Sequence, residues 1–209
     1  SHFQPHGDDT LELSLQKLGF STKDITDVLL THLHFDHCGG AIKRQGEKLV
    51  PSFEHATYWS NQMHWETATN PNIREKASFL KENILPIQES GQLKFLEAKD
   101  GISFNENIQL RFVYGHTEAM MLPLINYNQQ KVLFTADLIP SLAHISLPWV
   151  MAYDMQPLHT LNEKENLLQQ AIDNHWLLFF EHDRAVECCS LQQTDKGIRH
   201  RDILQIADV

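Results

Sequence analysis

Cysteine is scarce in this sequence: there are three among 209 residues, and two of them, Cys188 and Cys189, are adjacent. Adjacent side chains point to opposite faces of a strand, so we do not expect the disulfide framework that is typical of small secreted domains. Free thiols favour a reducing compartment, and we therefore predict a cytoplasmic protein.

Long apolar runs and an excess of positive charge are also missing. No stretch approaches the roughly 18 apolar residues of a membrane-spanning helix, so we expect no membrane association. Lysine and arginine number 17 against 27 aspartate and glutamate, and the formal net charge is -10. Because such a chain repels phosphates, the composition disfavours nucleic acid as a partner. The composition is also compatible with a homodimer.

The start of the chain lacks an initiator methionine and an apolar signal segment. We interpret Ser1–Gly7 as a loop and expect the native chain to begin before Ser1. The length fits a single domain over residues 1–209, since domains commonly hold about 150 residues and often more.

Hydrophobic periodicity predicts helices alternating with strands. The expected helices span Asp9 to Gly19, much of Ala56–Leu85 with breaks at Pro71 and Pro86, and Asn162–Asn174. The expected strands are Val28–Leu30, Leu93–Leu96, Ile108–Tyr114, Met121–Tyr127, Lys131–Thr135 and Trp176–Phe180, with a hairpin turn at Asn126–Gln130. This order favours a layered α/β sandwich.

Histidine is abundant, with 13 residues dispersed along the chain rather than gathered in a run. Four potential metal ligands, His32, His34, Asp36 and His37, lie within six residues directly after a predicted buried strand. A loop at a strand end can fold such side chains around ions, and imidazole and carboxylate are ligands that zinc prefers. The alternative is a histidine-rich surface loop without a metal.

Three further residues each follow an apolar strand. His116 comes after Arg111–Gly115, Asp137 after Val132–Ala136, and His182 after Leu177–Glu181. Strand ends at one edge of a sheet converge on one cleft, so these side chains strengthen the prediction of a metal site.

Taken together, His-x-His-x-Asp-His, Gly-His-Thr, Thr-Ala-Asp and a last histidine resemble the metallo-β-lactamase superfamily, and most closely its lactonase and methyl parathion hydrolase-like branch. The resemblance runs from about Asp8 to His182 and implies an αββα four-layer sandwich, here N-terminally incomplete. It implies that His32, His34 and His116 hold one divalent ion, that Asp36, His37 and His182 hold a second, and that Asp137 bridges them. Zinc is the first expectation, with manganese, iron or cobalt as alternatives.

The resemblance further implies a hydrolase that uses a metal-bridging hydroxide to cleave a small-molecule lactone, carboxylic ester or phosphotriester. Asp36 would orient the attacking water or take its proton. The tyrosine that the lactonase branch often has after the bridging aspartate is replaced by Pro140. We therefore predict that His144 supplies a hydrogen bond to the oxyanion or a proton to the leaving group, with a pocket or surface histidine as the alternative.

Two other functions stay open. A glyoxalase II-like thioesterase shares the metal set, although that group resembles a two-domain protein with a basic extension after the last ligand, and few residues follow His182. A non-catalytic metal-binding regulator would also keep the site.

Several residues have no firm assignment from the sequence. Phe35, Trp59, Met120, Leu138 and Trp149 are candidates either for an apolar substrate pocket or for the core. The remaining histidines have no partners at ligand spacing, and we expect surface or core positions for His2, His6, His55, His64, His159, His175 and His200. Cys38 is expected to be a small buried residue.

Overall fold

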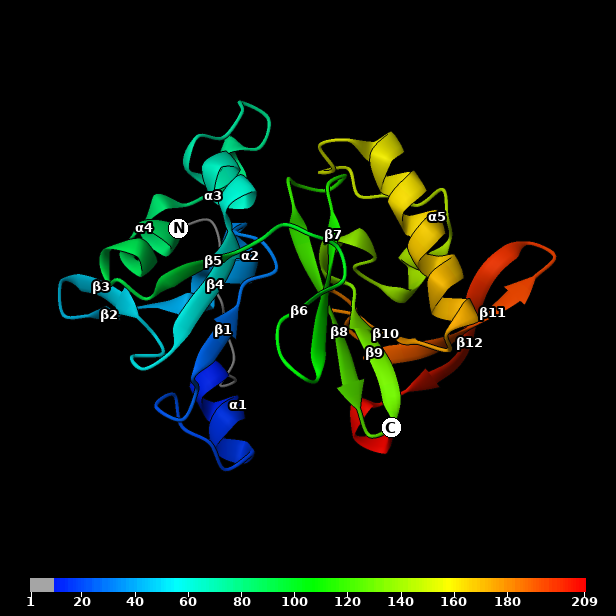
Figure 1. The fold of residues 1–209 in the computed structure, drawn as a ribbon, viewed down its shortest axis with the longest axis horizontal. Helices are drawn as coiled ribbons and strands as arrows, with labels where there is room; N and C mark the ends of the chain where they lie inside the picture. Colours follow the sequence, from blue (N-terminus) through cyan, green and yellow to red (C-terminus); the bar gives the residue numbers. More distant parts are fainter. Residues whose placement is uncertain (1–9) are drawn as a thin grey trace.

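A computed structural model of the protein describes residues 10–209. Two β-sheets face each other at the centre of the molecule, and helices cover their outer sides (Figure 1). The predicted loop Ser1–Gly7, with His2 and His6, lies outside the described residues. The arrangement confirms the prediction of an α/β sandwich.

The first half of the chain forms a three-stranded parallel sheet. Strand β4 (Thr57–Asn61) lies between β1 (Asp27–Leu29) and β5 (Leu93–Leu96). A two-stranded hairpin, β2 (Ile42–Gln45) with β3 (Lys48–Pro51), lies beside it.

Four helices accompany this half. Helix α1 (Leu11–Lys17) is capped by Thr10, whose Oγ1 accepts a hydrogen bond from the Leu13 N–H, and Gly19 follows with a φ of 83°. This helix was predicted from the leucine spacing. The others are α2 (Phe35–Cys38), α3 (Gln62–Thr69) and α4 (Lys81–Glu89), with short 3₁₀ helices at Gly39–Ala41 and Lys76–Ser78.

The second half of the chain forms a seven-stranded sheet in the order β12-β11-β10-β9-β8-β7-β6. Within it only β9 and β10 pair in parallel, and the other neighbours are antiparallel. The strands are β6 (Ile102–Ser103), β7 (Ile108–Val113), β8 (Met120–Tyr127), β9 (Gln130–Phe134), β10 (Leu177–Phe179), β11 (Cys188–Thr194) and β12 (Gly197–Leu204).

The turn between β8 and β9 is the predicted hairpin. Asn128 and Gln129 both have positive φ, at 45° and 68°, as a tight two-residue hairpin loop requires. The first five residues of β8, starting at Met120, are buried, which explains why this strand reads as a continuous apolar run.

Helix α5 (Pro157–Asp173) packs on the outer face of this sheet (Figure 1). Proline at its start suits the first turn, where the missing N–H costs no hydrogen bond. Leu167, Leu168 and Ala171 enter the core beneath it. Three further 3₁₀ helices lie at Ala136–Leu138, Leu142–Ile145 and Ile206–Asp208.

Two of the sequence predictions for Ala56–Leu85 and its flank are wrong. Residues 57–61 form a strand rather than a helix, because they complete the sheet between β1 and β5. Pro86 lies inside α4 instead of ending it. It is buried with Ile84 and Ile87, so the packing of that face outweighs the hydrogen bond lost at the proline nitrogen. Pro71 does follow the end of α3, as expected.

None of the helices within residues 10–209 combines the length and apolarity that a bilayer crossing requires. Separate apolar clusters fill each half, and a third cluster around Leu110, Phe112 and Met121 is joined by Leu29 and Leu96 from the first sheet. That third cluster holds the two sheets together. One domain over residues 1–209 stays a prediction.

The interior of the larger sheet should carry much of the stability. Leu133 on β9 is fully buried, so Leu133→Ala should lower the free energy of unfolding by about 2–5 kcal/mol through lost burial and a residual cavity. Urea denaturation followed by circular dichroism measures this. The control is Ile203→Ala on β12, which is 54% exposed and should change stability by less than about 1 kcal/mol. Equal losses in both variants would contradict this account of the core.

Candidate metal centre

The first ligand loop leaves β1 and is fastened to the opposite sheet. Leu30 N–H donates to the Trp59 carbonyl on the neighbouring strand, and the Thr31 carbonyl accepts from the Met121 N–H on β8. His34 then takes an extended conformation before α2 begins. The loop that carries His32, His34, Asp36 and His37 is thus held between the two sheets at the ends of their strands.

The turn that carries His116 is shaped by α5. The two carboxylate oxygens of Glu163 accept from the N–H groups of Tyr114 and Gly115, at 2.7 and 2.9 Å. Gly115 lies so close to α5 that a Cβ placed there would be 2.4 Å from the Thr160 nitrogen. Glycine before His116 is therefore required by close packing of the two backbones.

Asp137 and His182 follow the parallel strands β9 and β10. Thr135 Oγ1 donates to the carbonyls of Ile139 and Phe179, which closes the turn after β9. His182 N–H donates to the Pro140 carbonyl at 3.0 Å. These bonds bring the ends of the two strands together, as the sequence pattern predicted.

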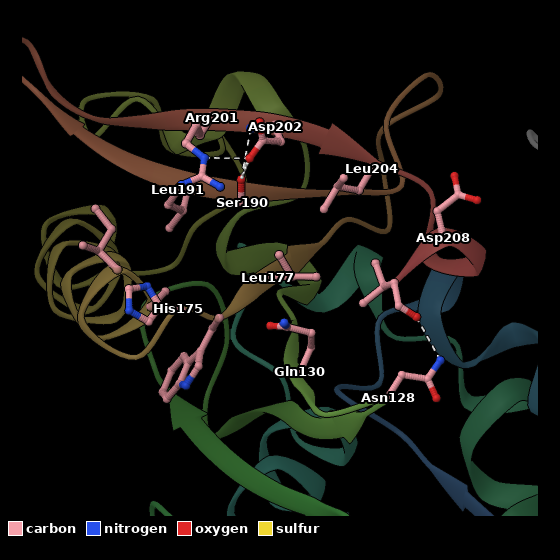
Figure 2. Close-up of a pocket in the computed structure, with 14 residues that line it drawn as sticks. Asn128, Gln130, His175, Leu177, Ser190, Leu191, Arg201, Asp202, Leu204 and Asp208 are labelled. Atoms are coloured by element: carbon pink, nitrogen blue, oxygen red, sulfur yellow. Dashed lines mark hydrogen bonds and ion pairs between the residues drawn. The ribbon is translucent and has the colours of Figure 1, made fainter.

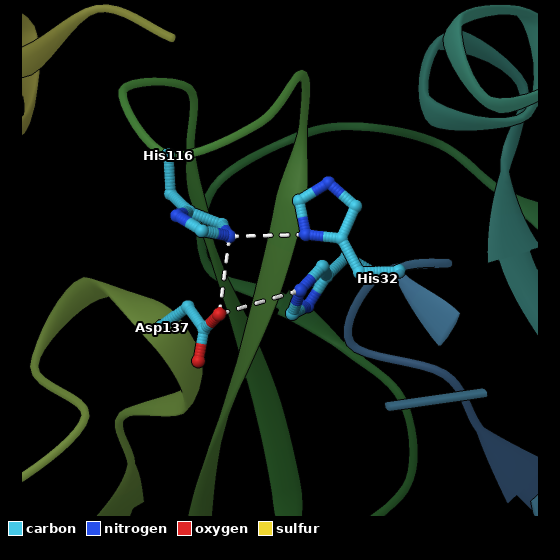
Figure 3. Close-up of side chains that lie close together, drawn as sticks. His32, His116 and Asp137 are labelled. Carbon is cyan, nitrogen blue, oxygen red and sulfur yellow. Dashed lines mark hydrogen bonds and ion pairs between the residues drawn. The ribbon is translucent and has the colours of Figure 1, made fainter. Parts of the chain in front are cut away.

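The Asp137 carboxylate lies at the centre of the cluster and is 4% exposed. On one side, its Oδ2 is 3.1 Å from His116 Nε2 and 3.8 Å from His32 Nε2 (Figure 3). His34 joins this group, with its Nδ1 3.2 Å from His116 Nε2. One ligand atom from each of these four residues lies within 4.8 Å of the others.

On the other side, Asp137 faces two histidines of different chain segments. Its Oδ2 is 3.2 Å from His37 Nε2, and its Oδ1 is 3.2 Å from His182 Nε2. The two histidine nitrogens are 3.2 Å apart. Asp137 therefore belongs to both groups, which is the arrangement expected of a residue shared by two ions.

The donor set fits divalent metal ions. His32 Nε2 is buried and has no hydrogen-bond partner, although a buried imidazole nitrogen is costly to leave unpaired. Asp137 Oδ1 likewise lacks a hydrogen bond, despite its proximity to His182. Both atoms point at a centre composed of nitrogen and carboxylate oxygen, the ligands that zinc and related ions take.

Asp36 stays a predicted ligand. Its side chain is 44% exposed, and its Oδ2 lies 3.7 Å from His37 Nε2, the nitrogen that faces Asp137. By distance alone, Glu181 falls into the same group as His37, Asp137 and His182. However, Glu181 contacts Nδ1 of His37, the opposite ring nitrogen, at 3.0 Å. We therefore assign Glu181 to the orientation of the His37 ring rather than to an ion.

Two other histidines of the predicted ligand set contact carboxylates in the same way. Asp154 Oδ1 lies 2.9 Å from His116 Nδ1, and Glu75 Oε1 lies 3.1 Å from His34 Nε2. Glu75 also accepts from the Thr117 hydroxyl. Such carboxylates fix the ring orientation and raise the basicity of the ligand nitrogen. Sequence reasoning missed Glu75, Asp154 and Glu181, because none of them belongs to a spaced motif.

The charges of the centre are strongly coupled. Burial alone would raise the pKa of Asp137, but the ring nitrogens of His116, His182 and His37, which lie 3.1 to 3.2 Å from its oxygens, hold it well below its usual range. Burial would lower the pKa values of His37 and His116. Contacts with Asp137 and the backing carboxylates Glu181 and Asp154 instead raise them to about 10 and about 9. The carboxylates thus favour positive charge here, which a proton or a metal ion can supply.

His64 ties the two ligand loops together. It is 1% exposed, its Nε2 accepts from the Leu33 N–H at 2.7 Å, and its Nδ1–H donates to the Glu118 carbonyl at 2.7 Å. Burial lowers its pKa to about 4, so the ring is neutral and can accept and donate at once. The sequence pattern predicted a surface or core position and offered no signal for this structural role.

Comparison with known proteins agrees with the geometry. The model of the metallo-beta-lactamase superfamily matches residues 5–182. The chain belongs to the metallo-beta-lactamase superfamily. A search of curated proteins found no sequence match.

Solved structures with the same fold include a probable metal-dependent hydrolase from Staphylococcus aureus, with 26% identity and a TM-score of 0.80 over 95% of this chain and 70% of that one. The dizinc quorum-quenching lactonase AidC, solved with a product, has 24% identity and a TM-score of 0.75 over 93% of this chain and 70% of that one. The hydrolase AbOPH has 20% identity and a TM-score of 0.76 with the same coverage. Membership in the superfamily and the His/Asp cluster together support a metal-dependent hydrolase.

The centre opens onto a cavity of about 820 Å³. His144, Phe35 and Asp36 line it together with Pro140, Ser141 and the segment Val150–Tyr153. Among the five candidate pocket residues, Phe35 is in this lining, whereas Met120 and Leu138 are buried in the core. Trp59 instead donates its indole N–H to Asp27, and Trp149 is exposed beside His144.

A second cavity, of about 490 Å³, is shown in Figure 2. Its lining includes Gln130 and Leu177, where β9 and β10 begin, so it lies at the end of these strands opposite to Asp137 and His182. His175, Arg201 and Asp202 are among its lining residues, and Arg201 pairs with Asp202. Within residues 10–209, the groups of metal-ligating side chains lie at the first cavity and not here.

The backing carboxylates should control metal affinity. Asp154→Ala removes the partner of His116 Nδ1, so the dissociation constant for the metal should rise by about 10- to 100-fold. Competition with a chromophoric chelator measures this for the full chain. The control is Glu165→Gln, which also removes one negative charge but at an exposed position on α5. This variant should bind metal as the unchanged protein does. Equal affinity in both variants would show that Asp154 does not support the site.

Proposed function

We propose that this protein is a dinuclear metal-dependent hydrolase that cleaves a lactone, a carboxylic ester or a phosphotriester. The observation that carries the proposal is the single buried carboxylate of Asp137 between two sets of histidine nitrogens, at the base of an apolar cavity. The solved structure of the lactonase AidC, which has a similar fold, supports the same class of reaction.

The proposed ligand set is the one that the motif predicts. One ion would be held by His32, His34 and His116, the second by Asp36, His37 and His182, and both by Asp137. Two divalent ions would supply an acidified water and positive charge beside the oxygen on which negative charge develops. Zinc is our first expectation, and manganese, iron or cobalt would suit the same donors.

The chain supplies the groups that handle protons. Asp36 is partly exposed and lines the cavity, so its carboxylate can hold the attacking water and accept its proton. His144 lies on the same lining, and its Nδ1 is 2.8 Å from Ser141 Oγ. Burial, and then the nearby Lys164 ammonium, lower the pKa of His144, so its ring is neutral near pH 7. We propose that the N–H of this neutral ring donates a hydrogen bond to the oxyanion; in the alternative role, the ring first takes up the proton of the attacking water and then gives it to the leaving group.

The cavity chemistry favours a neutral small molecule. Its described lining is mainly apolar, with Phe35, Pro140, Val150 and Met151 contributing, and contains no lysine or arginine. Away from the histidines of the centre, an anionic substrate would therefore find no cationic side chain in this lining. Hydrolysis of a thioester and a purely metal-binding role are the alternatives. A cytoplasmic location, a homodimer and the absence of a nucleic-acid partner stay predictions.

A substrate panel tests the proposal. Lactones, aryl esters, phosphotriesters and thioesters should be offered to the full chain, with metal analysis on the same sample, and at least one of the first three classes should be cleaved. Asp137→Asn should weaken metal binding and lower kcat/KM by roughly 100-fold or more, since the shared carboxylate loses its charge. Two bound metals with no cleavage of any ester would favour the regulator, and cleavage of thioesters alone would favour the thioesterase.

The role of His144 has its own test. His144→Ala should leave the metal content unchanged and lower kcat by about 10- to 100-fold, because a positioned donor to the oxyanion or the leaving group is lost. Steady-state kinetics with a good and a poor leaving group measure the effect. If His144 protonates the leaving group, the loss should be larger for the poor one. Unchanged kinetics with both substrates would show that His144 lines the cavity without a chemical role.

A further inference from the structure

One wall of the active-site cavity is a segment without helix or strand, residues 146–154, which we call the wall segment. Val150, Met151, Ala152 and Tyr153 within it line the cavity, and Tyr153 is 71% exposed. Backbone carbonyls outside regular structure need other partners when they are buried. Two cationic side chains supply those partners here.

The first is Lys164 on α5, which is fully buried. Its ammonium group donates to the carbonyls of Ser146, Leu147 and Trp149, at 2.7, 3.1 and 2.7 Å. All three N–H donors of the ammonium are therefore used. Burial lowers the pKa of Lys164 to about 8, which shows the cost of placing this charge in the interior. A buried lysine whose every donor meets the same loop holds that loop in one conformation.

The second is Arg74, which comes from the other half of the molecule. Its Nη2 donates to the carbonyls of Ala152 and Asp154, at 2.8 and 3.2 Å. The next residue, Glu75, supports the ligand His34. The wall segment is thus held at its start from α5 and at its end from the loop after α3.

The wall segment is also joined to the metal centre itself. Asp154, its last residue, contacts His116 through its carboxylate, and the following Met155 N–H donates to the His116 carbonyl. The position of the wall relative to the ligands is therefore set by polar contacts at several points. None of these contacts uses the side chains that face the cavity, so Val150, Met151 and Tyr153 remain available to meet a substrate.

We propose that Lys164 and Arg74 are positioning residues that set the distance between this wall and the metal centre, and so determine how large an apolar acyl group the cavity accepts. The proposal rests on the proposed hydrolase function. Neither side chain is assigned any contact with the reacting atoms. Losing either one should widen the range of wall positions without removing a ligand.

The test is the acyl-chain dependence of hydrolysis in Lys164→Met and Arg74→Met, each of which keeps a long side chain and removes the donors. Aryl esters from acetyl to decanoyl serve as substrates. KM for the longest ester should rise by about tenfold in both variants, with metal content unchanged, while in Arg74→Met kcat for the acetyl ester stays within about twofold. Lys131→Met, an equal charge change at an exposed site on β9, is the matched control and should show neither effect.

Lys164→Arg adds a rescue test, since it restores a cation and several donors at the same place. It should recover part of the lost affinity for the longest ester. An equal fall in kcat/KM for every ester in both methionine variants would mean that the two residues only stabilise the fold, and would overturn the proposal. Should Lys164→Met fail to fold, Arg74→Met decides, because Arg74 lies on the surface.

A second measurement separates this inference from the proposed function. Amide hydrogen exchange in residues 146–154 should become faster in Lys164→Met and Arg74→Met, while residues 31–38 keep the exchange rates of the unchanged protein. This readout needs no substrate. If no ester is cleaved but the wall exchanges faster, the hydrolase proposal fails and the positioning role stands. Unchanged exchange in both variants would overturn the positioning role even in an active enzyme.

Discussion

The structure depends on one buried negative charge, the Asp137 carboxylate at the junction of two sheets. A carboxylate in an apolar interior is stable only when cations or hydrogen-bond donors surround it. Here His37, His116 and His182 do so at 3.1 to 3.2 Å, and they come from three segments that are distant in the chain. His32 and His34 complete the group around the carboxylate. The charge of Asp137 thus explains why those strand ends must converge and why the site suits divalent ions.

The histidines around Asp137 are themselves held by further polar contacts. His34, His37 and His116 each use one ring nitrogen toward the centre and the other toward a carboxylate, Glu75, Glu181 or Asp154. This arrangement fixes ring orientation and leaves little freedom in the ligands. Beyond it, contacts from α5 and from the loop after α3 hold the turns and the cavity wall. The two sheets therefore act as a support for the centre, and the irregular segments between them shape what can reach it.

Much of the local structure could be read from the residues themselves. The leucine spacing predicted α1, the apolar runs predicted β7 to β10, and the turn residues predicted the β8–β9 hairpin. The segment Thr57–Asn61 was misjudged because aromatic and polar residues suit a helix or a strand equally until neighbours are known. Pro86 was misjudged because local propensity gives way to the burial of the α4 face. The strands β11 and β12, which carry few apolar residues in sequence, gave no pattern to follow.

The sequence by itself determined which donor types the centre offers, because the residue types and their spacing within His32–His37 do not depend on the rest of the fold. It also indicated that His116, Asp137 and His182 follow strands. Only the tertiary structure decided which groups stand behind those ligands, what His64 and Lys164 do, and which apolar residues face the cavity. The reason is physical: a single buried histidine, lysine or carboxylate has no periodic signature, and its role is set by partners that lie many residues away and meet it only when the chain is folded.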